Sequence, residues 1–199
     1  MYGRSRIVLF LGRLGAGRRN RTGRRGAKGA DVADVLLVID VQRALLDELG
    51  PARGEELLST LVPLLERARA GRLPVVYVRH DGSPHELIPG TPAWEIASAI
   101  APRAGEPIVD KRSPDAFAGT NLADVLAQLD ADHLIITGMQ TDVCVNATIS
   151  TAAERGYRLT LVADAHATST ANEHQVREAM HAATAARGVR VGAAGELFA

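Results

Sequence analysis

Three residues of the sequence have side chains that could together perform nucleophilic catalysis: Asp40, Lys111 and Cys144. A thiol can attack a carbonyl carbon, a carboxylate can take the thiol proton, and an ammonium group favours both resulting anions. Taken singly, each residue has a simpler interpretation, as a strand-end cap, a solvated lysine or a small buried hydrophobe. The question is therefore whether the fold brings the three together.

Each of the three residues follows a predicted β-strand. These strands are the apolar runs at residues 35–39, 107–110 and 134–136. In an open parallel sheet, the ligand crevice lies outside the carboxyl ends of the strands. We therefore expect the carboxylate, the ammonium and the thiol to meet at that edge of the sheet.

The segment that carries Cys144 is predicted to begin a helix. Thr141 offers a helix N-cap, Asp142 adds an acid to the first turn, and Gly156 ends the helix. A thiol in the first turn faces the positive end of the helix dipole and unpaired backbone N–H groups. Both favour the thiolate, which is the reactive form of cysteine.

The remaining elements alternate between strands and helices. Further strands are predicted at residues 73–78, 158–162 and 189–191, and helices at 54–70, 94–100, 120–129 and 171–187. Pro63 is an interior defect that could kink the first of these helices. The alternation predicts an α/β fold, in which helices cover both faces of a parallel sheet. Residues 79–106 form a long excursion rich in Gly and Pro, and such loops are often functional.

Charge divides the chain into two parts. Residues 1–30 hold nine basic residues and no acid, whereas residues 31–199 hold 14 basic and 23 acidic residues, a net charge of −9. The basic segment could bind nucleic acid or anionic surfaces, act as a targeting peptide, or be a disordered extension or translated upstream sequence. The segment is rich in Gly and Arg and has few apolar side chains that could be buried, which favours disorder.

We therefore assign residues 1–33 to a basic, disordered extension and residues 34–199 to one domain. No apolar run reaches membrane-spanning length, and we expect neither a membrane nor nucleic acid as a partner. Cys144 is the only cysteine, so an internal disulfide is excluded and a reducing, cytoplasmic compartment is expected.

Four segments resemble the isochorismatase-like cysteine hydrolases, a family that includes nicotinamidases, N-carbamoyl amidohydrolases and ureidoacrylate hydrolases. They are LLVIDVQ at 36–42, PGTPAWEI at 89–96, DKRSPDAFAGTNL at 110–122 and ITGMQTDVCVNATISTAAERGY at 136–157. The last segment is the most specific, in the spacing of its glycine, threonine, cysteine and valine residues. The resemblance extends from residue 34 to about residue 192.

The resemblance implies a three-layer αβα sandwich whose six-stranded, mainly parallel sheet has the strand order 3-2-1-4-5-6. It implies a catalytic triad of Asp40, Lys111 and Cys144. It also implies a non-proline cis peptide bond at Met139–Gln140, and an oxyanion hole formed by the backbone N–H groups of Gln140 and Cys144. Relatives are often dimers or tetramers, so a homo-oligomer is expected.

The function implied is hydrolysis of a small-molecule amide or related C–N bond through a thioester on Cys144. Two alternatives remain open at this point. One is isochorismatase-type cleavage of a vinyl ether, for which the cysteine is dispensable. The other is a non-catalytic binding or redox-sensing domain in which Cys144 is an oxidisable thiol. A positioned base such as Asp40 favours an enzyme, because a sensor does not need one.

Trp94 and Phe117 are candidate substrate contacts. Trp94 could wall the substrate pocket or pack the excursion against the body of the domain, and Phe117 has the same two alternatives. Asp115 stands where family members often have serine, so it could alter the polarity near the pocket mouth.

The histidines do not predict a metal site. Nicotinamidases of the family bind a divalent metal through an Asp-x-His pair and further histidines, but this chain has no histidine before His80. His80, Asp81 and His85 do cluster, and a catalytic metal needs about three protein ligands. Because they fall in a Gly/Pro-rich stretch, we interpret them as a solvated polar loop. We expect no metal and no other cofactor.

Two residues after the strand at 158–162 have alternative roles. His166 could act as the base for the thiol, but the family does not use this position, and we interpret it as a polar loop residue. Asp164 is expected to hold backbone N–H groups of the turn that follows it.

Overall fold

The computed structural model describes residues 33–82 and 87–197. The expected extension therefore lies outside the described residues, except for Ala33, which begins the first strand. His85 also lies outside them. Among the helices of the described part, none combines the length and the apolar character that crossing a lipid bilayer requires.

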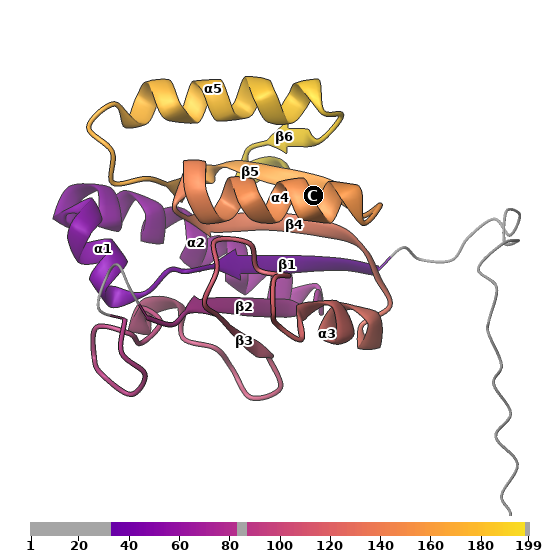
Figure 1. Cartoon of the computed structure of the whole chain (residues 1–199), viewed down its shortest axis with the longest axis horizontal. Helices are drawn as coiled ribbons and strands as arrows, with labels where there is room; N and C mark the ends of the chain where they lie inside the picture. Colours follow the sequence, from indigo (N-terminus) through magenta and orange to yellow (C-terminus); the bar gives the residue numbers. More distant parts are fainter. Residues whose placement is uncertain (1–32, 83–86, 198–199) are drawn as a thin grey trace, which may run out of the picture. The chain divides into compact units, whose positions relative to one another are not determined.

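Six strands form one sheet in which every neighbouring pair is parallel (Figure 1). They are β1 (Ala33–Ile39), β2 (Val75–His80), β3 (Ile108–Lys111), β4 (Ala131–Met139), β5 (Arg158–Ala167) and β6 (Arg190–Gly192). Their order across the sheet is β3-β2-β1-β4-β5-β6, as expected. Parallel neighbours need crossover connections, most of which helices supply here.

Helices lie on both faces of the sheet, which confirms the three-layer α/β architecture. They are α1 (Arg43–Leu49), α2 (Pro51–Ala70), α3 (Leu122–Gln128), α4 (Asn146–Glu154) and α5 (Glu173–Ala186), with the short turns η1 (Ser98–Ile100), η2 (Thr141–Val145) and η3 (Ala194–Glu196). The turn η2 is a single π-helical turn that leads directly into α4.

The apolar run of β1 serves two cores. Leu36 and Val38 pack under α1, α2 and η1, whereas Val35, Leu37 and Ile39 pack under α3, α4 and α5. Successive side chains of a strand point to opposite faces, so a strand covered on both sides must be apolar at every position. The continuous apolar run in the sequence follows from this central position.

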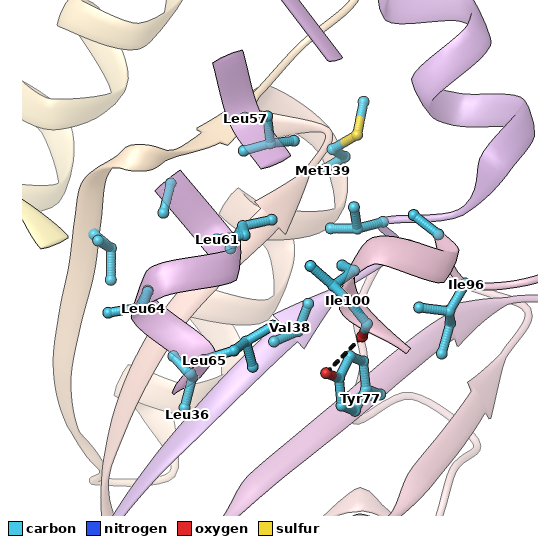
Figure 2. Packing of buried hydrophobic residues seen from close by; sticks show 14 of the residues in the cluster. Leu36, Val38, Leu57, Leu61, Leu64, Leu65, Tyr77, Ile96, Ile100 and Met139 are labelled. Atoms are coloured by element: carbon cyan, nitrogen blue, oxygen red, sulfur yellow. Dashed lines mark hydrogen bonds between the residues drawn. The ribbon is translucent and has the colours of Figure 1, made fainter. Parts of the chain in front are cut away.

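Figure 2 shows the first of these cores, in which leucines of α2 cover β1 and β2. Tyr77 of β2 is 1% exposed and donates its hydroxyl hydrogen to the carbonyl of Ile100 at 2.7 Å. That bond ties η1 to the sheet and satisfies the one polar atom that a buried tyrosine side chain carries.

Three of the helical elements differ from the sequence-based expectation. Helix α1 was not predicted, because seven residues are too few to establish a helical period. Helix α2 begins at Pro51 and continues through Pro63, where the buried leucines on either side hold it against the sheet. The helix predicted at residues 94–100 is only the turn η1, because Pro92 and Pro102 flank this short segment.

Strands β4 and β5 both run further than predicted. β5 continues to Ala167, so Asp164 and His166 belong to a strand and not to a loop. The carboxylate of Asp164 accepts a hydrogen bond from the backbone N–H of Ala194, 2.7 Å away. It therefore fixes the distant turn η3 and not the turn that follows it in sequence.

Gly138 allows β4 to lie close against β1 at Ile39, the residue that precedes Asp40. Its φ angle is +114°, and a Cβ placed there would be 2.0 Å from the carbonyl oxygen of Ile39. Side chains other than hydrogen therefore cannot be accommodated without moving one strand away from the other. Since Asp40 follows Ile39 directly, this close approach also fixes the backbone position from which the Asp40 side chain extends.

We expect Gly138→Ala to lower the free energy of unfolding by at least about 2 kcal/mol more than Gly156→Ala does, because overpacking adds to backbone strain. Gly156 is the matched control, since its φ is +85° but a Cβ at this position would have no heavy atom within 4 Å apart from those of its chain neighbours. Urea denaturation of both variants measures the difference. Equal losses of stability would show that the β1–β4 contact tolerates a methyl group.

Candidate active site

Asp40, Lys111 and Cys144 meet at the carboxyl edge of the sheet. Asp40 follows β1, Lys111 is the last residue of β3, and Cys144 lies in η2 after β4. The Nζ atom of Lys111 is 2.7 Å from Oδ2 of Asp40 and 3.2 Å from Sγ of Cys144. The structure thus brings together the three residues that the strand ends singled out.

All three groups are buried. Asp40 and Lys111 are each 1% exposed and Cys144 is 9% exposed, so Lys111 is not a solvated surface lysine. Asp40 has a φ of +54°, a conformation that aspartate adopts more readily than most residues. Its backbone N–H is nevertheless bonded to the carbonyl of Val78 on β2, which holds the strand end in place.

Burial dominates the electrostatics of the thiol. It raises the pKa of Cys144 to about 12, helped by the negative charge of Asp40 and only partly offset by the ammonium of Lys111. The expectation that the helix start favours a thiolate is therefore wrong. The desolvation cost of a buried anion exceeds the stabilisation that the Lys111 cation provides, so the resting group is a thiol.

Burial also raises the pKa of Asp40 above its ordinary value of 3.8, against the opposing effect of the Lys111 ammonium and of hydrogen bonds from Lys111 and Cys144. A carboxylate with a raised pKa is a stronger base than a solvated one. It is therefore better suited to take a proton from a neighbouring thiol.

His80 belongs to the same cluster, although the sequence suggested a solvated loop. It is the last residue of β2, is 8% exposed, and places Nδ1 3.0 Å from Nζ of Lys111. The interpretation as a solvated loop residue is wrong because β2 extends two residues beyond the predicted strand end. A signal was present in the sequence: His80 closes the strand that lies between those of Asp40 and Lys111.

Asp40, His80 and Cys144 each place one possible metal ligand near the other two. These ligand atoms, a carboxylate oxygen, a ring nitrogen and a sulfur in that order, lie within 4.8 Å of one another. Carboxylate, imidazole and thiolate are all ligands of Zn²⁺. The Lys111 ammonium already makes close contacts with all three side chains.

Thr141 and His166 bond to each other, and neither has its predicted role. The hydroxyl of Thr141 lies 2.8 Å from Nδ1 of His166, and it makes no N-cap bond. His166 is a buried strand residue whose Nε2 lies 2.9 Å from Nε2 of His181 on α5. Burial and the neighbouring His181 and Arg177 lower the pKa of His166 to about 3, so its ring stays neutral at physiological pH.

Three successive residues after β4 are anchored through their side chains to the end of β5. In addition to the Thr141–His166 bond, Ser169 N–H donates to Oε1 of Gln140 at 2.7 Å, and the Thr168 hydroxyl donates to Asp142 at 2.7 Å. The segment begins with the cis peptide bond Met139–Gln140, which is present as expected. These bonds fix the backbone that leads to Cys144.

Trp94 packs the excursion against the body of the domain. It is half-buried beside the first core, and the guanidinium of Arg79 lies 3.3 Å from its ring centroid. The side-chain amide of Gln42 donates to its carbonyl at 2.7 Å. This supports the packing role, while contact with a substrate stays a prediction.

Phe117 lies in the second core and is 6% exposed. Its ring stacks on Tyr157 at a centroid distance of 5.9 Å. The neighbouring Asp115 accepts hydrogen bonds from the N–H of Phe117 and from the hydroxyl of Thr151 on α4. Asp115 thus joins the segment after β3 to α4, and substrate contact by Phe117 stays a prediction.

Known proteins resemble this chain in sequence and in structure. The family model described as the Isochorismatase domain matches residues 34–193. A streptothricin hydrolase from Streptomyces noursei is 40% identical over 136 residues, which are 67% of this chain and 54% of that protein. A second streptothricin hydrolase is covered over 49% of its length, so the chain spans about half of these relatives.

Two solved structures share the fold over most of both chains. An isochorismatase from Pseudomonas putida KT2440 superposes with a TM-score of 0.75 at 30% identity, covering 83% of this chain and 90% of that one. The N-carbamoylsarcosine amidase from Thermoplasma acidophilum superposes with a TM-score of 0.73 at 25% identity, covering 83% and 99%.

The charges around the thiol predict opposite effects of two substitutions. Asp40→Asn removes a negative charge and should lower the pKa of Cys144, whereas Lys111→Met removes a positive charge and should raise it. At one fixed pH that is lower than the Cys144 pKa of every protein compared, a change of one unit in that pKa changes the thiolate fraction about tenfold. Alkylation by iodoacetamide should therefore be faster in the first variant and slower in the second than in the native protein.

Mass spectrometry measures this labelling without ambiguity, because Cys144 is the only cysteine. Circular dichroism must show that each variant is folded, since removing one member of a buried ion pair can cost about 3–5 kcal/mol. Equal labelling rates in the three folded proteins would show that the two charges do not act on the thiol.

Proposed function

Because the chain belongs to the isochorismatase family, we propose that it is a cysteine hydrolase that cleaves a small amide or related C–N bond through a thioester. The observation that carries this proposal is the contact of the Cys144 thiol with a buried cation that is itself paired with a buried carboxylate. This arrangement supplies a nucleophile, a base and a fixed positive charge at one point.

The relatives support an amide substrate. One is named a streptothricin hydrolase and another an N-carbamoylsarcosine amidase, whereas a third is named an isochorismatase. A cysteine nucleophile suits acyl transfer, in which a thioester divides one difficult step into two easier ones. The presence of Cys144 in this chain therefore favours an amide over the vinyl ether of an isochorismatase.

In the first half of the proposed reaction, Sγ of Cys144 attacks the carbonyl carbon while Asp40 accepts the thiol proton. The carbonyl oxygen becomes an oxyanion, which the backbone N–H groups of Gln140 and Cys144 stabilise. The C–N bond then breaks, and the leaving amine takes the proton from Asp40. A thioester on Cys144 remains.

In the second half, Asp40 accepts a proton from a water molecule as the oxygen of that water attacks the thioester carbon. The C–S bond breaks, the carboxylic acid leaves, and the proton held by Asp40 returns to the sulfur. The ammonium of Lys111 contacts both Asp40 and Cys144 and stabilises whichever of the two is anionic.

A redox-sensing role is less well supported than hydrolysis. Sensor cysteines are exposed and have a low pKa, whereas Cys144 is 9% exposed and its pKa is raised to about 12. A thiol of that kind reacts when a base takes its proton during attack, which is what a substrate bound beside Asp40 would allow.

Three further proposals rest on the sequence alone. The segment 1–33 is a basic extension, the single cysteine suits the cytoplasm, and the resemblance favours a homo-oligomer. Size-exclusion chromatography with light scattering would measure the oligomeric state directly.

Replacing the nucleophile should abolish amide hydrolysis and leave the fold intact. Cys144→Ala puts a small apolar side chain into a buried position, so little stability should be lost. The measurement is turnover of a panel of small amides and carbamoyl compounds, with mass spectrometry to detect an acyl adduct on the native protein. Substantial turnover by the folded alanine variant would exclude the thioester route and point to vinyl-ether cleavage.

The acid limb of the activity profile should lie above the ordinary carboxyl pKa of 3.8, because burial raises the pKa of Asp40. Below its pKa, Asp40 is protonated and cannot accept the thiol proton, so activity should fall as the pH falls through that value. The dependence of kcat/KM on pH measures this limb. An acid limb at or below pH 3.8 would rule out Asp40 as the base.

A further inference from the structure

The ammonium of Lys111 lies among four acceptors. Its Nζ atom is 2.7 Å from Oδ2 of Asp40, 3.0 Å from Nδ1 of His80, 3.0 Å from the carbonyl oxygen of Ser113 and 3.2 Å from Sγ of Cys144. An ammonium group has three hydrogens to donate. The acceptors around it therefore decide where those hydrogens point.

The contact with Lys111 shows which ring nitrogen of His80 accepts a hydrogen bond. An ammonium group can only donate, so Nδ1 must accept and cannot carry a proton. In the neutral ring the proton is then on Nε2. His80 thus presents a lone pair to Lys111 and can accept a hydrogen bond from the ammonium.

The position of His80 is itself fixed by a second buried side chain. The amide of Gln42 accepts a hydrogen bond from the backbone N–H of His80 at 2.8 Å and donates to its carbonyl oxygen at 2.9 Å. His80 also pairs directly with Lys111 in the β2–β3 register. The backbone of His80 is therefore held on two sides, by the Gln42 side chain and by β3. Its ring reaches the ammonium from a rigid strand end.

We propose that His80 is the positioning residue for Lys111, and that Asp40, His80 and Cys144 form a cage for one cation, which in the native protein is the Lys111 ammonium. His80 acts on the reaction through Lys111, and this part of the inference rests on the proposed hydrolase function. The cage itself does not depend on that function.

The geometry of the cage suits a metal ion if the ammonium is removed. Its three ligand atoms are already within 4.8 Å of one another, and zinc binds sulfur, nitrogen and carboxylate oxygen at about 2.0–2.3 Å. The ligand atoms now lie 2.7–3.2 Å from Nζ, so each would need to move inward by about 1 Å or less. Lys111 and a thiophilic divalent cation should therefore be mutually exclusive.

Cadmium binding tests the cage without any substrate. Titration of the full-length native protein, Lys111→Ala and Lys111→Ala/His80→Ala with CdCl₂ is followed by the ultraviolet absorption of the cadmium–thiolate bond. We expect Lys111→Ala to bind one Cd²⁺ at least about tenfold more tightly than the native protein, and the double variant to lose most of this gain. Equally tight binding by the native protein and Lys111→Ala would overturn the cage.

Two substitutions of His80 test its positioning role. His80→Ala removes the acceptor, whereas His80→Asn places an amide oxygen near the position of Nδ1. We expect His80→Ala to lower kcat by roughly 10- to 100-fold, the range for residues that support a catalytic group, with a smaller change in KM. It should also slow alkylation of Cys144, because the ammonium is no longer held beside the sulfur, and His80→Asn should restore both.

The alkylation readout separates this inference from the proposed function. If the native protein hydrolyses no amide in the panel, the rate of Cys144 labelling in the two His80 variants still reports on Lys111. Unchanged labelling in folded His80→Ala would overturn the positioning role. So would a loss of turnover that His80→Asn does not relieve while both variants keep the native thermal stability.

Discussion

The buried ion pair between Lys111 and Asp40 is the constraint on which the site depends. Both side chains are out of contact with solvent, and removing two charges from water costs several kcal/mol per ion unless each has close partners. The two residues come from β3 and β1, which are separated in the sheet by β2. The ion pair can therefore form only when β1, β2 and β3 end at the same edge of the sheet. His80, at the end of β2, lies between the two strand ends.

The same low-polarity surroundings determine the chemistry of the nucleophile. Burial opposes any isolated anion, so it raises the pKa of the thiol and of the carboxylate together. One cation is shared by two potential anions, and only one of them is expected to be charged at a time. Proton transfer from Cys144 to Asp40 then moves the negative charge within reach of Lys111 and does not create a new one. This favours deprotonation during attack over a thiolate formed beforehand.

The carboxyl end of β5 provides the second support of the site. His166 of β5 and the two residues that follow the strand, Thr168 and Ser169, hold the segment 140–142 through separate hydrogen bonds, and His181 extends this contact to α5. Because His166 stays neutral over the physiological range, the bond to Thr141 does not change with pH there. The segment before Cys144 is thus held by tertiary contacts, while Gly138 lets its strand approach β1.

The sequence by itself determined the α/β fold, its strand order through the family resemblance, and the three residues that meet at the sheet edge. The alternation of strands and helices and the three residues depend on apolar periodicity and on which residue follows each strand, and both are local properties of the chain. Only the tertiary structure decided that His80 joins Lys111, that Thr141 bonds to His166 and does not cap a helix, and that Cys144 rests as a thiol. Those outcomes depend on strand register and burial, because a side chain's partner and its exposure to water are set by segments far apart in the sequence.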